Sequence, residues 1–253
     1  MNSILRKIVG FWFWLWTMIS APFYGLILAF VILFGNAKVK RRFARLSYFY
    51  VPRWLCYPCG VKFETKGLKK LQKGKQYILV SNHQSTLDIF ANPATCPVHF
   101  KYLAKDEVRT IPLLGAIAKP FCIFVKRGDR KSRSDSMEAL IEAIEKDGSS
   151  LLIYPEGTRN RTGEPLKKFY DGAFRIAIKT KTPIVVQTLL NTGYLGPPDD
   201  LFNLSPGTVH AIWDDPIETS ELTIDDLPIL KERVRSIMLQ NLENYATESK
   251  RHA

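Results

Sequence analysis

The sequence predicts an α/β protein with a mixed, largely buried sheet flanked by helices, preceded by an N-terminal hydrophobic two-helix membrane anchor. Three observations lead to this prediction. After Lys62, short apolar runs alternate with segments of helical periodicity, which is the pattern of an α/β domain. Before that point, residues 8–37 carry no charged side chain. Most of the excess of basic over acidic residues also lies in the first 63 residues.

The uncharged stretch from Ile8 to Ala37 is thirty residues long, whereas a bilayer-spanning helix needs about 20 apolar residues. It is also longer than the roughly 7–15 apolar residues of a secretory signal, so we expect a retained anchor and not a cleaved leader. Pro22 and Gly25 interrupt the run, which favours a kinked or re-entrant helix over a straight span. The alternative is a buried pair of core helices, but a domain of this size rarely hides thirty uncharged residues.

A second segment, from Leu46 to Val61, is rich in aromatic residues but contains Pro52 and Arg53. This composition is typical of a helix that lies at the level of the lipid headgroups. We therefore divide the chain into membrane-anchoring helices at 1–60 and an α/β domain at 61–253.

The charge distribution indicates the partner of the anchor. The first 63 residues hold nine basic and no acidic side chains, so they account for +9 of the formal net charge of +12. This predicts binding to acidic membrane phospholipids and no binding to nucleic acid. If the first helix spans the bilayer, the basic residues after it place the main domain on the cytoplasmic face. A hairpin that dips into one leaflet fits the same charges.

Five apolar runs of the main domain are interpreted as buried strands. They are Gln76–Ser81, Phe121–Val125, Ser150–Tyr154, Ile184–Leu190 and Thr208–Trp213. Between the second and third strands, apolar residues recur at helical spacing, with Ser134 and Asp135 as candidate caps and Gly148 as the stop. A last helix is expected from about Leu227 to Ala246.

A polar cluster follows the first of these strands directly, at residues 81–88. Ser85 and Asp88 have the spacing of a capping box, which would begin a helix at Thr86 and leave His83 on the loop before it. The Asp88 carboxylate could then accept the proton on one imidazole nitrogen and leave the other nitrogen as a base. On these two residues alone, the alternative stays open that Asp88 only caps the helix and His83 is a surface histidine.

Two further polar clusters follow the second and third strands. In the first of them, at 126–133, Arg127 is the arginine nearest the strand and can bind a phosphate bidentately. In the other, at 154–159, Glu156 and Arg159 supply a charged pair. A solvated basic loop and a tight turn with a surface ion pair are the structural alternatives. Because open α/β sheets bind ligands at the carboxyl edge of their strands, three clusters in such places predict a site at that edge.

Four blocks of residues, in this order along the chain, resemble a known family. They are Asn82-His83-x4-Asp88, Ile123-Phe124-Val125-Lys126-Arg127, Tyr154-Pro155-Glu156-Gly157-Thr158-Arg159 and Thr182-Pro183-Ile184-Val185-Val186. Together they resemble the glycerolipid acyltransferases. The branch they are most similar to is the 1-acylglycerol-3-phosphate (lysophosphatidic acid) acyltransferases of the PlsC type. The resemblance covers residues 60–215, and the hydrophobic N-terminal hairpin also suits this family.

The resemblance implies a reaction with assigned roles. His83 would be the general base that deprotonates the sn-2 hydroxyl of 1-acylglycerol 3-phosphate, and Asp88 would orient it. The hydroxyl oxygen would attack the thioester of acyl-ACP or acyl-CoA, a co-substrate and not a bound cofactor, to give phosphatidic acid without an acyl-enzyme intermediate. Backbone amides near Ser85 are candidates for stabilising the thioester oxyanion.

The resemblance also assigns residues to the acceptor's glycerol phosphate. These residues are Arg127, Glu156, Gly157, Thr158 and Arg159. Lys105 falls between the first two blocks and is a further candidate for a phosphate contact.

Two other functions stay open at this point. The same mechanism can act on glycerol 3-phosphate or a lyso-aminolipid, and a non-catalytic basic membrane-binding protein would leave His83 incidental. No metal site is expected, because His99, His210 and His252 are scattered and lack ligand spacing. The sequence also contains neither the G-x-S-x-G elbow of a serine hydrolase nor a phosphate-binding P-loop.

Overall fold

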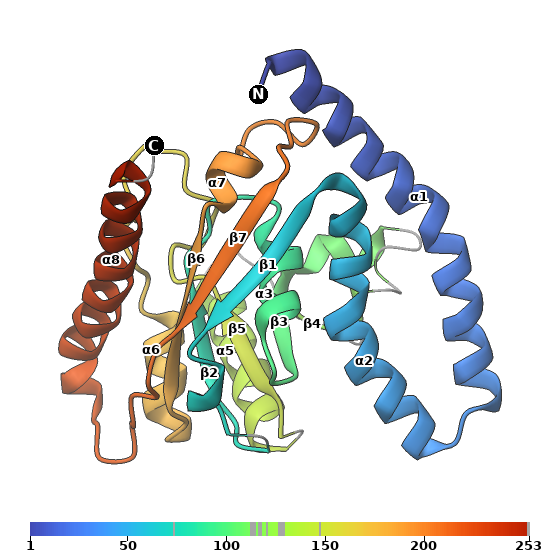
Figure 1. Cartoon of the computed structure of the whole chain (residues 1–253). Helices are drawn as coiled ribbons and strands as arrows, with labels where there is room; N and C mark the ends of the chain where they lie inside the picture. Colours follow the sequence, from blue (N-terminus) through green and yellow to red (C-terminus); the bar gives the residue numbers. More distant parts are fainter. Residues whose placement is uncertain are drawn as a thin grey trace.

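The structure is a computed structural model that describes residues 1–72, 74–111, 115, 118–119, 121–125, 130–146 and 148–251. In these residues a seven-stranded sheet lies between two layers of helices (Figure 1). The strand order is β1-β7-β6-β2-β5-β3-β4. The strands are β1 (Val61–Lys66), β2 (Ile78–Ser81), β3 (Phe100–Lys105), β4 (Cys122–Val125), β5 (Ser150–Ile153), β6 (Ile184–Leu190) and β7 (Gly207–Trp213).

Neighbouring strands pair in parallel, except for β6 and β7, which are antiparallel. The pair β1 and β7 therefore runs opposite to the other five strands. This confirms the predicted α/β class with a mixed sheet. It also places the carboxyl ends of β2, β3, β4 and β5 at one edge.

The helices cover both faces of the sheet (Figure 1). They are α1 (Ser3–Phe34), α2 (Ala37–Cys56), α3 (Asp88–Thr95), α5 (Arg130–Glu145), α6 (Gly172–Thr180), α7 (Thr192–Leu195) and α8 (Leu227–Arg251). Short 3-10 turns lie at Tyr57–Cys59, Leu68–Lys70, Asp106–Thr110 and Ile224–Asp226. One face packs against α5, α6 and α8, and the other against α3 and the N-terminal helices.

The central strands are buried on both faces. In β2, Ile78 and Val80 belong to the core shared with α5, α6 and α8, whereas Leu79 packs with residues of α2 and β3 on the other side. A strand buried on both faces needs apolar residues at every position, which is why the sequence of β2 is a continuous apolar run.

Two strands, β1 and β3, were not predicted from the sequence. In β1, Val61 and Phe63 are buried while Lys62 and Glu64 are exposed. This alternation arises because β1 is an edge strand with one solvent-exposed face. Its lysines and glutamate lie on that face and interrupt the apolar pattern. In β3 most positions are only partly buried, which weakens the signal in the same way.

Several predicted helix limits were wrong. Helix α5 begins at Arg130, so the candidate caps Ser134 and Asp135 lie inside it and not at its start. Helix α3 begins at Asp88, two residues after the predicted start at Thr86. Helix α8 begins at Leu227 as predicted but extends to Arg251.

Helices α1 and α2 form an antiparallel hairpin along one side of the domain (Figure 1). Within the described residues, α1 is the one helix long and apolar enough to cross a membrane. It continues through Pro22, so the proline does not divide it. The two helices contact each other through Trp16, whose Nε1 donates to the Trp54 carbonyl at 3.1 Å.

The N-terminal half of α1 is docked on the α/β domain. Arg6 donates to the Tyr194 carbonyl at 2.7 Å, and Trp14 Nε1 donates to the Leu201 carbonyl at 2.9 Å. Apart from these contacts, α1 exposes large apolar side chains along its whole length. They include Ile4, Ile8, Phe11, Met18, Phe23, Leu26, Ile27, Phe30, Ile32, Leu33 and Phe34.

Candidate active site

The first and third polar clusters follow β2 and β5, whose carboxyl ends are neighbours at the same sheet edge. The structure brings their side chains together. The second cluster follows β4. Its residues 126–129, which include the candidate Arg127, lie outside the described residues.

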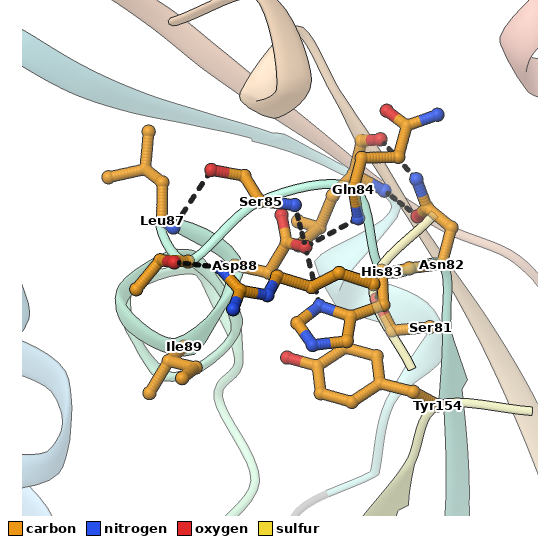
Figure 2. A network of polar contacts seen from close by, with 12 residues as sticks. Ser81, Asn82, His83, Gln84, Ser85, Leu87, Asp88, Ile89 and Tyr154 are labelled. Carbon is orange, nitrogen blue, oxygen red and sulfur yellow. Dashed lines mark hydrogen bonds and ion pairs between the residues drawn. The ribbon is translucent and has the colours of Figure 1, made fainter. Parts of the chain in front are cut away.

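His83 and Asp88 are in contact, as the sequence predicts. His83 Nδ1 lies 2.8 Å from Asp88 Oδ2 (Figure 2). The same oxygen accepts the backbone N–H groups of Gln84 at 2.7 Å and Ser85 at 2.8 Å, and the Asp88 side chain is fully buried. A carboxylate fixed in this way is an acceptor for a proton on Nδ1. It leaves Nε2 of His83, whose side chain is 14% exposed, as the nitrogen that can act as a base.

The local sequence produces this geometry because Asp88 is the first residue of α3, where a carboxylate is favoured by the helix dipole. The predicted capping box is only half formed. Asp88 accepts the N–H of Ser85, but the Ser85 hydroxyl oxygen accepts from the N–H of Leu87 at 3.0 Å. The amides of Gln84, Ser85 and Leu87 are therefore occupied, and the predicted oxyanion role for amides near Ser85 is wrong for these three.

Glu156 joins the first and third clusters. Its Oε1 accepts the N–H of His83 and its Oε2 accepts the N–H of Lys167, both at 2.9 Å. The side chain is fully buried, and burial raises the pKa of the carboxyl while the two N–H donors act in the opposite direction. An acidic group that already holds two backbone amides is poorly suited to contact a phosphate. The structure therefore gives Glu156 the role of fixing the His83 loop, instead of the predicted contact with the acceptor or charged pair with Arg159.

The other residues of the third cluster lie around Glu156. Arg159 Nη1 donates to Thr86 Oγ1 at 2.6 Å and to the Pro198 carbonyl at 2.9 Å, so the guanidinium lies beside the loop that carries His83. Thr158 Oγ1 accepts from Lys167 Nζ at 2.6 Å. Gly157 has a φ of +72°, a left-handed conformation that favours glycine.

Lys167 was missed by the sequence analysis. It lies in the irregular segment between β5 and α6, where no periodicity or motif points to it. Lys105 is the last residue of β3 and so lies at the same edge of the sheet, but its side chain is exposed and pairs with Glu107 at 2.8 Å. The contacts of the described residues do not bring Lys105 to His83.

The ring of Tyr154 stacks on the ring of His83 (Figure 2), with 4.0 Å between centroids and 12° between planes. No role was predicted for this tyrosine, which the sequence marks only as the residue directly after β5 and the first of the block at 154–159. In the part of the chain that the structure describes, no three His, Cys, Asp or Glu side chains come together as metal ligands.

A pocket opens next to the His83 loop, between α1 and the start of α3. Its lining includes Ser85 and Thr86 of the His83 loop and the polar residues Asp200 and Asn203. The apolar lining residues include Phe13, Trp14, Leu87, Phe90, Pro197, Leu201 and Leu204.

Comparisons with known proteins identify the family of the chain. A family model described as Acyltransferase matches residues 62–188. The 1-acyl-sn-glycerol-3-phosphate acyltransferase of Saccharomyces cerevisiae is 32% identical over 87% of this chain and 72% of its own length. The chloroplastic 1-acyl-sn-glycerol-3-phosphate acyltransferase LPAT1 of Arabidopsis thaliana is also 32% identical, over 88% of this chain, which spans 62% of the plant protein.

A solved structure shares the fold. The crystal structure of the 1-acyl-sn-glycerophosphate (LPA) acyltransferase PlsC from Thermotoga maritima superposes with a TM-score of 0.82 at 21% identity. It covers 97% of this chain and 98% of the other. From the family match and the identity to the yeast protein, the chain belongs to the acyltransferase family.

Proposed function

We propose that the chain transfers a fatty acyl group from an acyl thioester to the sn-2 hydroxyl of 1-acylglycerol 3-phosphate, which yields phosphatidic acid. The observation that carries this proposal is the contact of His83 Nδ1 with the buried Asp88 carboxylate at the carboxyl edge of the sheet. The acceptor is supported by relatives named for this reaction in yeast, plants and mammals. The donor is a thioester of acyl carrier protein or coenzyme A.

In the proposed reaction, His83 Nε2 takes the proton of the acceptor hydroxyl as its oxygen attacks the thioester carbonyl. The tetrahedral intermediate then expels the thiolate, which receives the proton from the imidazolium. Asp88 stabilises the imidazolium in between, as the partner of Nδ1. General base catalysis of this kind contributes about 10²- to 10⁴-fold to a rate. These steps use no bound cofactor or metal.

Substrate binding is assigned to the groups around the His83 loop. Arg159 supplies a guanidinium beside Thr86, and Lys167 supplies an ammonium at Thr158. We assign the acceptor phosphate to these two cations, with Gly157 allowing the backbone to approach it.

We also propose that the α1–α2 hairpin holds the protein on a membrane as a re-entrant element, with the α/β domain on the cytoplasmic face. The exposed apolar side chains of α1 support this, and so do the exposed basic residues Lys38, Lys40 and Arg42 at the start of α2. Since the N-terminal half of α1 is docked on the domain, a re-entrant hairpin keeps these contacts whereas a full span would break them.

The test is an acylation assay with the full-length protein in mixed micelles. Labelled acyl-CoA and acyl-ACP are offered with lysophosphatidic acid, glycerol 3-phosphate or a lyso-aminolipid. We expect lysophosphatidic acid to be acylated, and His83→Ala to lower kcat by about 10²- to 10⁴-fold. Asp88→Asn should also lower kcat strongly. His210→Ala is the matched control, because His210 pairs with Glu64 across β1 and β7, outside the site.

The outcomes separate the parts of the proposal. If no acceptor is acylated, or if His83→Ala stays within threefold of wild type, the catalytic assignment is wrong. If glycerol 3-phosphate or a lyso-aminolipid is the preferred acceptor, the chemistry stands and the acceptor is wrong.

A further inference from the structure

The imidazole of His83 has a second neighbour besides Asp88. Tyr154 covers one face of the ring in a nearly parallel stack, with the centroids 4.0 Å apart. Asp88 contacts the edge of the ring at Nδ1 (Figure 2). Asp88 and Tyr154 therefore restrain different movements of the ring. A single hydrogen bond at Nδ1 leaves the ring able to tilt about the line joining Nδ1 and Oδ2. A flat partner against the face opposes that tilt.

The hydroxyl of Tyr154 is hydrogen-bonded to a buried side-chain amide, which is bonded to further buried polar side chains. Its hydroxyl donates to Oδ1 of Asn92 on α3. Asn92 Nδ2 in turn donates to Gln187 Oε1 on β6 at 2.6 Å and to Ser81 Oγ at the end of β2 at 3.2 Å. Gln187 Nε2 donates to Thr95 Oγ1 at 2.8 Å.

This chain of hydrogen bonds connects β5, α3, β6 and β2 inside the core. Asn92, Gln187 and Ser81 are fully buried. Buried polar groups are costly when unpaired, and a connected buried network holds its members in one arrangement. Burial also raises the pKa of Tyr154 well above its usual value, with Tyr102 and Asp88 acting in the same direction, so the hydroxyl stays protonated and remains a donor.

We propose that Tyr154, anchored through Asn92 and Gln187, is a positioning residue that sets the plane of the His83 ring and so the direction of Nε2. This inference rests on the proposed function, because the direction of Nε2 matters only if His83 accepts the substrate proton. A reacting group displaced by about 1 Å can cost about 10²-fold in rate. The stacked ring thus orients the base, and the hydrogen bond from its hydroxyl to Asn92 makes a smaller contribution.

Two substitutions at Tyr154 separate the ring from the hydroxyl. Tyr154→Leu removes the stack, whereas Tyr154→Phe keeps it and removes only the hydrogen bond to Asn92. Tyr102→Leu is the matched control, since Tyr102 packs in the same aromatic cluster and donates to the Ile89 carbonyl at 3.0 Å instead of stacking on His83. Each variant is measured for kcat, for KM of both substrates, and for the ring-proton resonances of His83 in ¹³C-histidine-labelled protein, assigned with His83→Gln.

We expect Tyr154→Leu to lower kcat by roughly 10- to 100-fold while both KM values stay within about twofold. Tyr154→Phe should restore kcat to within about threefold of wild type, because it loses one neutral hydrogen bond only. The His83 ring protons should lose the upfield shift of a stacked ring in Tyr154→Leu and keep it in Tyr154→Phe.

The inference is overturned if Tyr154→Leu keeps kcat within threefold, if Tyr154→Phe is as slow as Tyr154→Leu, or if Tyr102→Leu loses as much kcat as Tyr154→Leu. Unchanged His83 resonances in Tyr154→Leu also overturn it. If the wild-type protein acylates no acceptor, the proposed function fails by itself, and the resonances still test whether Tyr154 fixes the ring.

Discussion

His83 lies on a loop, yet each part of the residue is held by a different segment of the chain. Asp88 contacts Nδ1, Glu156 accepts the backbone N–H, and the N–H of Asn160 donates to the His83 carbonyl at 2.6 Å. A loop has no periodic hydrogen bonds of its own, so such contacts are what make its geometry precise. The third polar cluster therefore supports the first as well as supplying charge.

Arg159 is the residue we expect to distinguish phosphorylated from unphosphorylated acceptors. Arg159→Ala should raise KM for lysophosphatidic acid by about 10- to 100-fold, the effect of losing one charge-assisted hydrogen bond to phosphate, and should change kcat little. With a monoacylglycerol acceptor, which lacks the phosphate, the same variant should behave like wild type. Steady-state kinetics with both acceptors measure this.

The neighbouring Arg161 is the control for this prediction, because it pairs with Asp199 at the surface at 2.9 Å. Arg161→Ala should leave KM for lysophosphatidic acid within about twofold. An unchanged KM in Arg159→Ala would move the phosphate site elsewhere.

Among the elements, α1 contacts the α/β domain mainly through its first half. This half contacts the loop at 194–204 through side chains and through a close approach at Gly10, whereas large apolar side chains are exposed along the whole helix. A Cβ atom on Gly10 would lie 1.8 Å from the carbonyl oxygen of Phe202. The glycine therefore allows the helix backbone to lie directly against the loop that lines the pocket.

Gly10→Leu should force α1 away from this loop. Overpacking of this kind costs about 1–3 kcal/mol, which corresponds to a fall in Tm of roughly 2–12 °C for a protein of this size. Gly25→Leu is the matched control on the same helix, because no atom lies within 4 Å of a Cβ at Gly25. Thermal unfolding in detergent compares the two, and an equal Tm in both variants would contradict the docking of α1.

For the whole molecule, the arrangement of the hairpin predicts a topology. If α1 is re-entrant and its first half remains docked, the N-terminus and the C-terminal helix α8 lie on the same side of the membrane. Epitope tags at both ends should then be digested together by protease added to inverted bacterial membrane vesicles. Both tags should be protected in intact spheroplasts.

A spanning α1 gives the opposite pattern, in which one tag is digested from each side. This outcome would show that the docking of α1 is lost in the membrane. A variant with Lys38, Lys40 and Arg42 changed to Ser provides a second comparison. It should bind anionic vesicles more weakly than the wild-type protein, since each basic residue near an acidic surface contributes about 1 kcal/mol.

The sequence by itself determined the α/β class, five of the seven strands and the long apolar N-terminal helix, and it predicted the contact of His83 with Asp88 while leaving open that His83 is a surface histidine. These features depend on residues that are close in the sequence or on strands buried on both faces, so their signal is local. The resemblance in four blocks also named the family correctly.

Only the tertiary structure decided the rest of the site. Glu156 was expected at the phosphate, but it holds the amides of His83 and Lys167, which lie 73 and 11 residues away in the sequence. The stack of Tyr154 on His83 and the contact of Asn92 with Gln187 likewise join separate elements. Such contacts depend on which strands become neighbours in the sheet. The order β6-β2-β5, which creates them, follows from how the whole chain packs and has no signature in any single segment.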